Sequence, residues 1–252
     1  MKSSANPALL RCHQLTRRWG GLVAVNEVNL DLLQGEVHAV IGTNGAGKST
    51  LINLLSGQFP PSGGRVELLN RDVSLWSQPR RARAGLGRSY QRNTIYGEFS
   101  VIENCRLAAQ AARQRPWQWW QSVHAQADLM ETACSVAKRT GLSDYLSRPA
   151  GLLSHGQKRQ LEIAMCLATR PKVLLLDEPL AGMGAEETER MLALLRDLKA
   201  DHAILLVEHD MDAVFRIADR ITVMVNGSVI ATGSPDEIRS NKLVQSAYLG
   251  DH

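Results

Sequence analysis

The 252-residue sequence is poor in cysteine, and no two of its four cysteines form a CxxC pair. Scattered single cysteines give little support to a structural zinc site or to a thiol–disulfide redox motif. A disulfide framework is also unexpected in a reducing compartment. We therefore expect all the cysteines to be small, buried apolar residues. They are Cys12, Cys105, Cys134 and Cys166.

Long hydrophobic runs are also missing. No apolar run approaches the roughly 18 residues that a membrane-spanning helix needs. The first eleven residues carry one lysine and none of the apolar core that secretory signals have. We therefore expect a cytoplasmic protein that reaches a membrane only through another component.

Charge of one sign is not in large excess. The chain has 29 Lys and Arg against 25 Asp and Glu, a formal net charge of +4. This excess is far below that of a protein that coats nucleic acid, so no nucleic-acid partner is expected. With 44% hydrophobic and 21% charged residues, the chain is neither disordered nor collagen-like. Its length fits one large domain or two closely packed domains.

Short apolar runs alternate with helical patterns in much of the chain. Residues 37–41, 173–176 and 203–207 are short, largely apolar runs, as in parallel strands that are buried on both faces. Helical patterns follow the first two runs, at 48–56 and 185–200. This alternation predicts an α/β fold with a parallel sheet.

Two regions differ from that alternation. The first forty residues contain strand patterns at 9–12 and 22–33, which indicate an additional β region. From 100 to 145, strand patterns vanish and Ala, Gln, Leu and Arg dominate, which predicts a helical insert. Near the C-terminus, the dipeptide 226–227 (Asn-Gly) predicts a hairpin turn. Residues 234–237 (Ser-Pro-Asp-Glu) predict a capping box at a helix start.

The clearest chemical motif is GTNGAGKST at residues 42–50, which fits the P-loop pattern G-x-x-x-x-G-K-[ST]. Gly45 and Gly47 allow backbone N–H groups to converge on phosphate oxygens, and Lys48 adds a full positive charge toward the β- and γ-phosphates. Ser49 is placed to bind magnesium. The candidate nucleotide-binding residues of the loop are Gly42, Asn44, Gly45, Ala46, Gly47, Lys48, Ser49 and Thr50.

Two carboxylates end the apolar run at 173–176. Burying a carboxylate at the C-terminal end of a strand is costly unless it faces a cation or a polar crevice. We therefore assign Asp177 to the magnesium shell and Glu178 to the polarisation of the attacking water.

A third motif precedes an amphipathic helical pattern. Ser154 and Gly156 stand at the expected start of that helix, which makes them a candidate anion site. A serine N-cap alone is commonplace, so this motif gains its weight from the other two.

With these motifs the chain resembles an ABC-type ATPase subunit over nearly its whole length. The family's LSGGQ signature corresponds to Leu153–Gln157, in which His155 replaces the first glycine. The family's Q-loop glutamine corresponds to Gln91, and its switch histidine to His209. Trp19 stands where the family keeps an aromatic residue that stacks on adenine.

The resemblance implies the fold and its parts. It implies a P-loop NTPase (RecA-like) α/β core with an N-terminal antiparallel β-subdomain and an inserted α-helical signature subdomain. Residues 1–252 would form a single ABC ATPase domain. Within it, 1–92 and 171–252 would form the catalytic core with the β-subdomain, and 93–170 the helical subdomain.

The resemblance also implies ATP and Mg²⁺ as cofactors, and a site shared between two ATPase subunits. Its catalytic residues would be Glu178, His209, Gln91 and Lys48. Its magnesium ligands would be Ser49, Gln91 and Asp177. The second subunit would close the site with Ser154, Gly156 and Gln157. One departure is the loop Ala181–Gly184, which lacks the aspartate that couples the two sites in many members.

Within the family, the resemblance is strongest to ATP-binding subunits of bacterial branched-chain or other hydrophobic amino acid importers. The features that carry it are Leu161–Ala164, Glu208–Met211, the insert at 105–142 and the ending Ala247–Gly250. It implies membrane permease subunits, a periplasmic binding protein and an identical or paralogous ATPase partner. It places the chain at the cytoplasmic face of the inner membrane.

Other classes of ATPase or GTPase fit the sequence less well than an importer subunit. A lipopolysaccharide-export ATPase shares a similar ending but lacks so long an insert. A chromosome-maintenance ATPase would place a long coiled coil between Lys48 and Ser154, yet only 106 positions separate them. A translation factor of this kind carries two cassettes, and this chain has one. A GTPase would need Asn-Lys-x-Asp, but Asn241-Lys242 is followed by Leu-Val.

A cluster of arginines and a cluster of tryptophans each allow two interpretations. Arginines near the Q-loop predict either a solvated helix face or a surface that docks on a membrane partner. They are Arg80, Arg81, Arg83, Arg88 and Arg92. Three of the five tryptophans, Trp117, Trp119 and Trp120, predict either local packing in the insert or a contact with membrane subunits.

Overall fold

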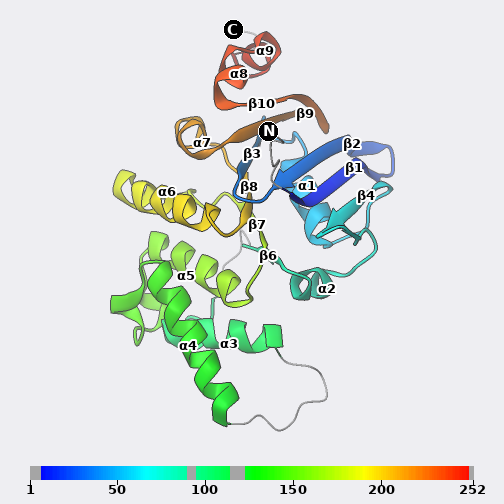
Figure 1. The fold of residues 1–252 in the computed structure, drawn as a ribbon. Coiled ribbons are helices and arrows are strands. Elements are labelled where there is room, and N and C mark those ends of the chain that lie inside the picture. Colours follow the sequence, from blue (N-terminus) through cyan, green and yellow to red (C-terminus); the bar gives the residue numbers. More distant parts are fainter. Residues whose placement is uncertain (1–6, 90–94, 114–122, 250–252) are drawn as a thin grey trace, which may run out of the picture.

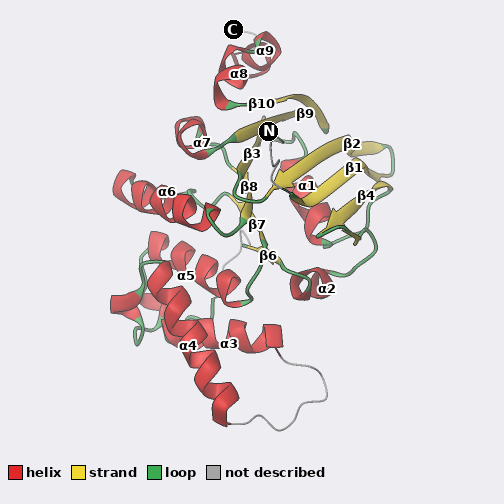
Figure 2. Cartoon of the chain, viewed as in Figure 1, coloured by secondary structure: helices red, strands yellow, loops and turns green. Residues whose placement is uncertain are grey.

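A computed structural model describes residues 7–89, 95–113 and 123–249. Gln91, Arg92 and the three clustered tryptophans therefore lie outside the described residues. The described chain forms two sheets and a set of helices around them (Figures 1 and 2). Among the described residues, no helix is long and apolar enough to cross a membrane.

The central sheet has six strands in the order β10-β9-β3-β8-β7-β6. All neighbours pair in parallel except β9 and β10, which form a hairpin. Its strands are β3 (Val37–Gly42), β6 (Leu86–Arg88), β7 (Val173–Asp177), β8 (Ala203–Val207), β9 (Arg220–Val225) and β10 (Ser228–Gly233). Every residue of β3, β7 and β8 is buried, as their largely apolar sequences predict, and burial extends to His38 of β3 and Asp177 of β7.

The second sheet is antiparallel, with the strand order β2-β1-β4-β5. Its strands are β1 (Ala8–Trp19), β2 (Leu22–Leu33), β4 (Gly63–Leu68) and β5 (Arg71–Asp72). The expected first strand at 9–12 is too short, because β1 continues to Trp19. Register shifts between β1 and β2, with Gln14 and Glu27 at positive φ, interrupt the alternation of apolar and polar residues by which a strand is predicted.

The helices comprise α1 (Lys48–Ser56), α2 (Gln78–Arg83), α3 (Val101–Arg113), α4 (Val123–Arg139), α5 (His155–Ala168), α6 (Ala185–Lys199), α7 (Met211–Ile217), α8 (Pro235–Ser240) and α9 (Lys242–Leu249). Two short 3₁₀ segments, η1 (Ser143–Tyr145) and η2 (Ala150–Leu152), lead from α4 to α5. Helices α3, α4 and α5 group at the end of the molecule opposite α8 and α9 (Figure 1). The helical insert expected at 100–145 is thus confirmed by α3 and α4.

The local signals near the C-terminus are also confirmed. Asn226 and Gly227 both have positive φ in the turn between β9 and β10. Ser234 caps α8, since its hydroxyl accepts from the Glu237 N–H and the Glu237 carboxylate accepts from the Ser234 N–H at 2.7 Å.

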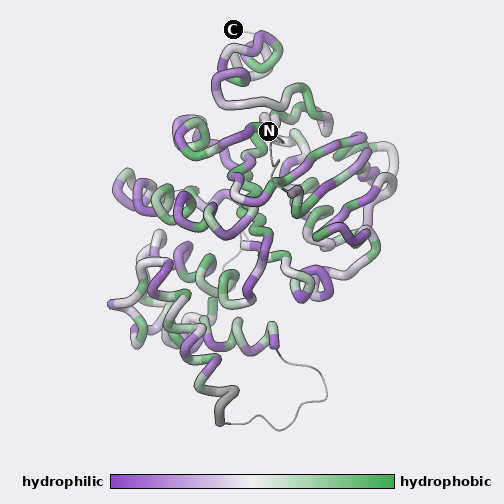
Figure 3. Tube along the Cα trace, viewed as in Figure 1, coloured by the Kyte–Doolittle hydropathy of each residue, from purple (hydrophilic) through white to green (hydrophobic). Residues whose placement is uncertain are grey.

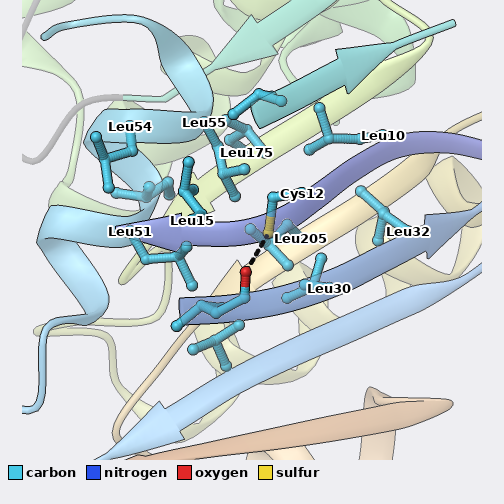
Figure 4. Packing of buried hydrophobic residues seen from close by; sticks show 14 of the residues in the cluster. Leu10, Cys12, Leu15, Leu30, Leu32, Leu51, Leu54, Leu55, Leu175 and Leu205 are labelled. Atoms are coloured by element: carbon cyan, nitrogen blue, oxygen red, sulfur yellow. Dashed lines mark hydrogen bonds between the residues drawn. The ribbon is translucent and has the colours of Figure 1, made fainter. Parts of the chain in front are cut away.

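Two hydrophobic layers cover the central sheet. On one face, the antiparallel sheet and α1 pack against β7 and β8 (Figure 4). The labelled residues of that layer are Leu10, Cys12, Leu15, Leu30, Leu32, Leu51, Leu54, Leu55, Leu175 and Leu205. On the other face, α5, α6 and α7 pack through apolar stripes. Figure 3 shows hydrophilic and hydrophobic residues alternating along α6, as expected for a helix with one face on the core.

Three of the cysteines are buried as expected, and burial raises the pKa of Cys12, Cys105 and Cys166 to about 12. Cys134 departs from the expectation, because it is only half-buried. It lies next to the buried stripe of α4, which contains Ala133 and Ala137.

The arginine cluster near the Q-loop does not act as one surface. Arg80 stacks its guanidinium on Trp76 at 3.9 Å, and Arg83 is exposed. Arg81, in contrast, is completely buried. Arg88 is also largely buried, with 9% of its side chain exposed. Both alternatives, a solvated face and a docking surface, are therefore wrong for Arg81 and Arg88.

Arg81 fastens α1 to the segment that follows the antiparallel sheet. Its guanidinium donates to the carbonyls of Leu54 and Leu55 at 2.8 Å each, at the C-terminal end of α1. It also donates to the Ser74 carbonyl at 2.9 Å and the Trp76 carbonyl at 3.2 Å. Burial lowers the pKa of Arg81 to about 10, so it remains charged at neutral pH. The side chain thus supplies donors to carbonyls at the end of α1, of which that of Leu54 also accepts from the Gly57 N–H at 3.1 Å.

We expect Arg81→Met to lower the free energy of unfolding by about 3 kcal/mol, because it removes the four hydrogen bonds that the buried guanidinium donates. Urea denaturation of the nucleotide-free protein measures this. Arg83→Met is the matched control on the same helix, and it should change stability by less than about 0.5 kcal/mol. Equal effects of the two substitutions would contradict the role given to Arg81.

Candidate functional site

The candidate residues gather at the carboxyl edge of the parallel sheet. The P-loop connects the end of β3 to α1, and Asp177 is the last residue of β7. His209 follows β8, the strand between β3 and β7. In parallel sheets, such an edge is where ligands bind.

The glycines of the P-loop have two different reasons to be glycine. A β-carbon at Gly42 would lie 2.3 Å from the Met224 carbonyl oxygen, and one at Gly47 would lie 2.3 Å from that of Ala24. These two positions therefore let β3 and α1 approach neighbouring backbone closely. Gly45 has φ of 78° but faces open space. Its backbone is available to a ligand without a side chain in the way.

Lys48 lies folded into its own loop. Its ammonium group donates to the carbonyls of Gly42 at 2.7 Å and Thr43 at 3.0 Å. The side chain is buried, and burial lowers its pKa, while the nearby charges of Glu178 and Asp177 oppose that shift. The cation is thus held at the mouth of the loop, beside the two carboxylates at the end of β7.

Asp177 is buried with one oxygen unused. Its side chain is 3% exposed, and Oδ2 lies 3.9 Å from the Arg88 guanidinium. Burial raises the pKa of Asp177, and the Arg88 charge lowers it. Arg88 is held by α1, since it donates to Ser56 Oγ and Asn53 Oδ1 at 2.6 Å each. Oδ1 of Asp177 has no hydrogen-bond partner within the described residues.

This donor set suits Mg²⁺. An orphaned carboxylate oxygen on Asp177 and the exposed hydroxyl-bearing Ser49 at the start of α1 are hard oxygen ligands. The described residues contain no group of three or more His, Cys, Asp or Glu side chains that could enclose a metal. Mg²⁺ is commonly held in this way, by one or two protein oxygens together with substrate phosphates.

Glu178 and His209 contact each other across the sheet edge. Glu178 Oε1 and His209 Nε2 lie 2.6 Å apart. Glu178 has a φ of 51°, a left-handed conformation that is uncommon for a non-glycine residue. Its N–H donates to the Val207 carbonyl at 2.8 Å, which continues the β7–β8 pairing by one residue. This strained position turns the carboxylate out of the strand toward His209.

Glu208, one of the residues that carry the family resemblance, is also part of the site. It is buried, and its carboxylate accepts from the Leu180 N–H at 2.7 Å and the His209 N–H at 3.0 Å. Burial raises its pKa, while these hydrogen bonds lower it. Glu208 therefore ties the loop after Glu178 to the histidine. Its position directly before His209 is the only sequence signal for this role.

The signature segment forms a capped helix start. The Ser154 hydroxyl accepts from the Gln157 N–H at 3.2 Å, and Gln157 Oε1 accepts from the Ser154 N–H at 2.9 Å. The expected N-cap is thus confirmed, as a full capping box. Within the described part of the chain, no hydrogen bond joins Ser154 to the P-loop. One chain therefore does not bring these two anion sites into direct contact.

Trp19 ends β1 and is 47% exposed. The Arg17 guanidinium lies 3.7 Å from the centre of its ring, and the Phe59 ring meets it edge-on at 5.2 Å. The aromatic side chain is therefore held in place while much of it faces solvent. Stacking on adenine stays a prediction.

Comparisons with known proteins agree with this geometry. The sequence profile of the family described as ABC transporter matches residues 25–181, and that of the branched-chain amino acid ATP-binding cassette transporter matches 228–252. The chain is 39% identical to the high-affinity branched-chain amino acid transport ATP-binding protein LivG of Salmonella typhimurium, over 96% of this chain and 98% of that protein. It is 37% identical to BraF of Pseudomonas aeruginosa, which bears the same description, with the same coverage.

Solved structures show the same fold. A nucleotide-free ATP-binding cassette from an ABC transporter superposes with a TM-score of 0.86 at 30% identity, covering 97% of this chain and all of that one. The ADP conformation of the cassette MJ1267 gives a TM-score of 0.86 at 29% identity, covering 98% and 100%. The expected α/β P-loop fold is confirmed. The chain belongs to the ABC transporter family, as one of its ATP-binding, ATP-hydrolysing cassettes.

Proposed function

We propose that this chain is the ATP-hydrolysing subunit of an importer of branched-chain or other hydrophobic amino acids. The observation that carries the proposal is near full-length similarity to LivG and BraF, together with the family match at residues 228–252. In this proposal the chain sits at the cytoplasmic face of the inner membrane. It docks on permease subunits that receive the amino acid from a periplasmic binding protein.

The nucleotide site follows from the sheet edge. The backbone of the loop from Gly42 to Thr50 receives the phosphates, and Lys48 exchanges its carbonyl partners for phosphate oxygens. Ser49 and Asp177, with Gln91, would hold Mg²⁺, which neutralises phosphate charge when bound. Trp19 would stack on the adenine.

Glu178 and His209 would have different roles in hydrolysis. Glu178 accepts a proton from the attacking water, because its carboxylate is turned out of the strand at the phosphate end of the loop. His209 orients Glu178 through their 2.6 Å contact. Glu208 keeps the His209 backbone and the loop after Glu178 in fixed relation.

The site is completed by a second ATPase subunit, either identical or paralogous. Ser154, Gly156 and Gln157 of that subunit would face the γ-phosphate, since a capped helix start offers backbone N–H groups to an anion. Residues 1–92 and 171–252 would act as the catalytic core, and 93–170 as the helical part that carries the signature. ATP binding would close the pair, and hydrolysis would release it.

We expect Glu178→Gln to slow ATP hydrolysis about a hundredfold or more, because the amide cannot take up the proton. ATP binding should be retained, and the ATP-bound dimer should accumulate. Single-turnover phosphate release and size-exclusion chromatography with light scattering measure the two effects. Glu186→Gln, an exposed charge-matched change, should leave both unchanged. Normal phosphate release in the Glu178 variant would exclude this residue as the base.

A mixing experiment tests the shared site directly. Lys48→Ala disables one half-site and Ser154→Ala the other, so each variant alone should be nearly inactive. An equimolar mixture should recover about a quarter of wild-type activity, because half of randomly formed dimers pair the two variants and each such dimer has one intact site. The measurement is made at concentrations at which wild-type hydrolysis rises with the square of protein concentration. No recovery would rule out a site shared between two copies.

Glu208→Gln tests positioning rather than binding. The amide provides one acceptor oxygen where the carboxylate provides two, so either the Leu180 or the His209 N–H loses its partner. We expect kcat to fall about tenfold with little change in the KM for ATP, since about 1.4 kcal/mol corresponds to a factor of ten. Steady-state kinetics measures the split. A rise in KM at constant kcat would place Glu208 in nucleotide binding instead.

A further inference from the structure

The signature site of this chain is already occupied by one of the chain's own carboxylates. Glu187, in the first turn of α6, accepts a hydrogen bond from the Ser154 hydroxyl at 3.0 Å. The same carboxylate crowds the helix start, because a β-carbon at Gly156 would lie 2.6 Å from Glu187 Oε1. Both candidate phosphate-facing residues of α5 thus contact Glu187.

This contact matters because the Ser154 hydroxyl can donate to only one partner at a time. A serine hydroxyl has one proton to donate. Its oxygen accepts from the Gln157 N–H, so the capping box uses the hydroxyl only as an acceptor and leaves its proton available to another group. In the structure that proton goes to Glu187. A phosphate oxygen of ATP can accept a hydrogen bond from this hydroxyl only if the hydroxyl no longer donates to Glu187.

Charge works in the same direction. The start of α5 favours an anion, through the N–H groups of its first turn and the helix dipole. Glu187 supplies a negative charge there before any nucleotide arrives. A triphosphate that approaches the same helix start is repelled until the carboxylate moves or is neutralised.

Glu187 has room to move. It lines a cavity of about 510 Å³ between α6 and the end of α4, together with Ser154 and Gly156. The charged contact between Glu187 and Ser154 can therefore be exchanged for another.

We propose that Glu187 occupies the γ-phosphate position of the signature helix in the open chain, and that it thereby sets the ATP concentration at which two subunits close. The inference rests on the proposed function, because it requires the nucleotide to be clasped by Ser154 of a facing subunit. It adds to that site a residue that competes with the nucleotide: an anion must displace Glu187 before it can bind Ser154.

The test measures ATP-driven dimerisation of purified full-length chain in a Glu178→Gln background, where hydrolysis does not reopen the dimer. Glu187→Ala removes both the charge and the acceptor, and Glu187→Gln removes the charge alone. We expect the ATP concentration for half-maximal dimerisation to fall about tenfold for Ala and less for Gln. A hydrogen bond to a charged group changes an equilibrium constant by about tenfold.

Two controls keep the result specific. Glu186→Gln changes the same charge in the same turn of α6 but its side chain is paired with Arg190, not with Ser154. It should leave the ATP midpoint unchanged. In a Ser154→Ala background, Glu187→Ala should have a smaller effect, because the proton over which the two anions compete is gone. A merely structural role of Glu187 would change thermal stability without this dependence on Ser154.

The outcomes separate the two proposals. An unchanged or higher ATP midpoint for both Glu187 variants, with a parent that dimerises normally, overturns the role of Glu187 and leaves the shared site intact. If neither the parent nor Glu186→Gln dimerises with ATP at any protein concentration, the shared site itself fails, and the role of Glu187 fails with it.

Discussion

Parallel pairing of three buried strands is the constraint on which the rest of this molecule depends. Asp177 of β7 lies in register with Val207 of β8, which lies in register with Val40 of β3. In each of the three strands, the site residue lies one or two positions beyond this line of paired residues. Gly42, Glu178 and His209 therefore emerge at one edge, although more than 160 positions separate the first from the last. An antiparallel arrangement would send alternate strand ends to opposite edges and disperse the same residues.

Charges at this edge are arranged so that a ligand can take over existing partners. Lys48 binds carbonyls of its own loop, and Arg88 lies between α1 and Asp177. Among the described residues, one oxygen of Asp177 finds no hydrogen-bond partner, and Glu178 contacts His209. Burying these charges is tolerable because each has a counter-charge or a dipole nearby. A nucleotide with its cation exchanges these contacts rather than creating buried charges anew.

Much of this arrangement could be predicted from the sequence, because it is encoded locally. The P-loop, the strand that ends in Asp177 and the cap at Ser154 each depend on residues a few positions apart, and each is where its pattern predicts. The residues that sequence reading missed act over long distances. Arg81 reaches from α2 to carbonyls of α1, and Glu187 reaches from α6 to α5. Nothing in the local sequence distinguishes a buried arginine from a solvated one in a run of arginines.

The segment from Glu178 to Glu187 explains how chemistry and signature can be linked without the family's usual aspartate. The loop Ala181–Gly184 has no carboxylate, so no acidic side chain can reach out from it. The segment is nevertheless fastened at both ends. Near Glu178, the Leu180 N–H is held by Glu208, and near Glu187, the carboxylate binds Ser154. In the nucleotide-free chain, this short stretch therefore joins the loop after Glu178 to the start of α5. In the proposed dimer, the facing subunit's nucleotide would displace Glu187 from Ser154, so binding at one site would release the far end of the segment that begins at Glu178 of the other site.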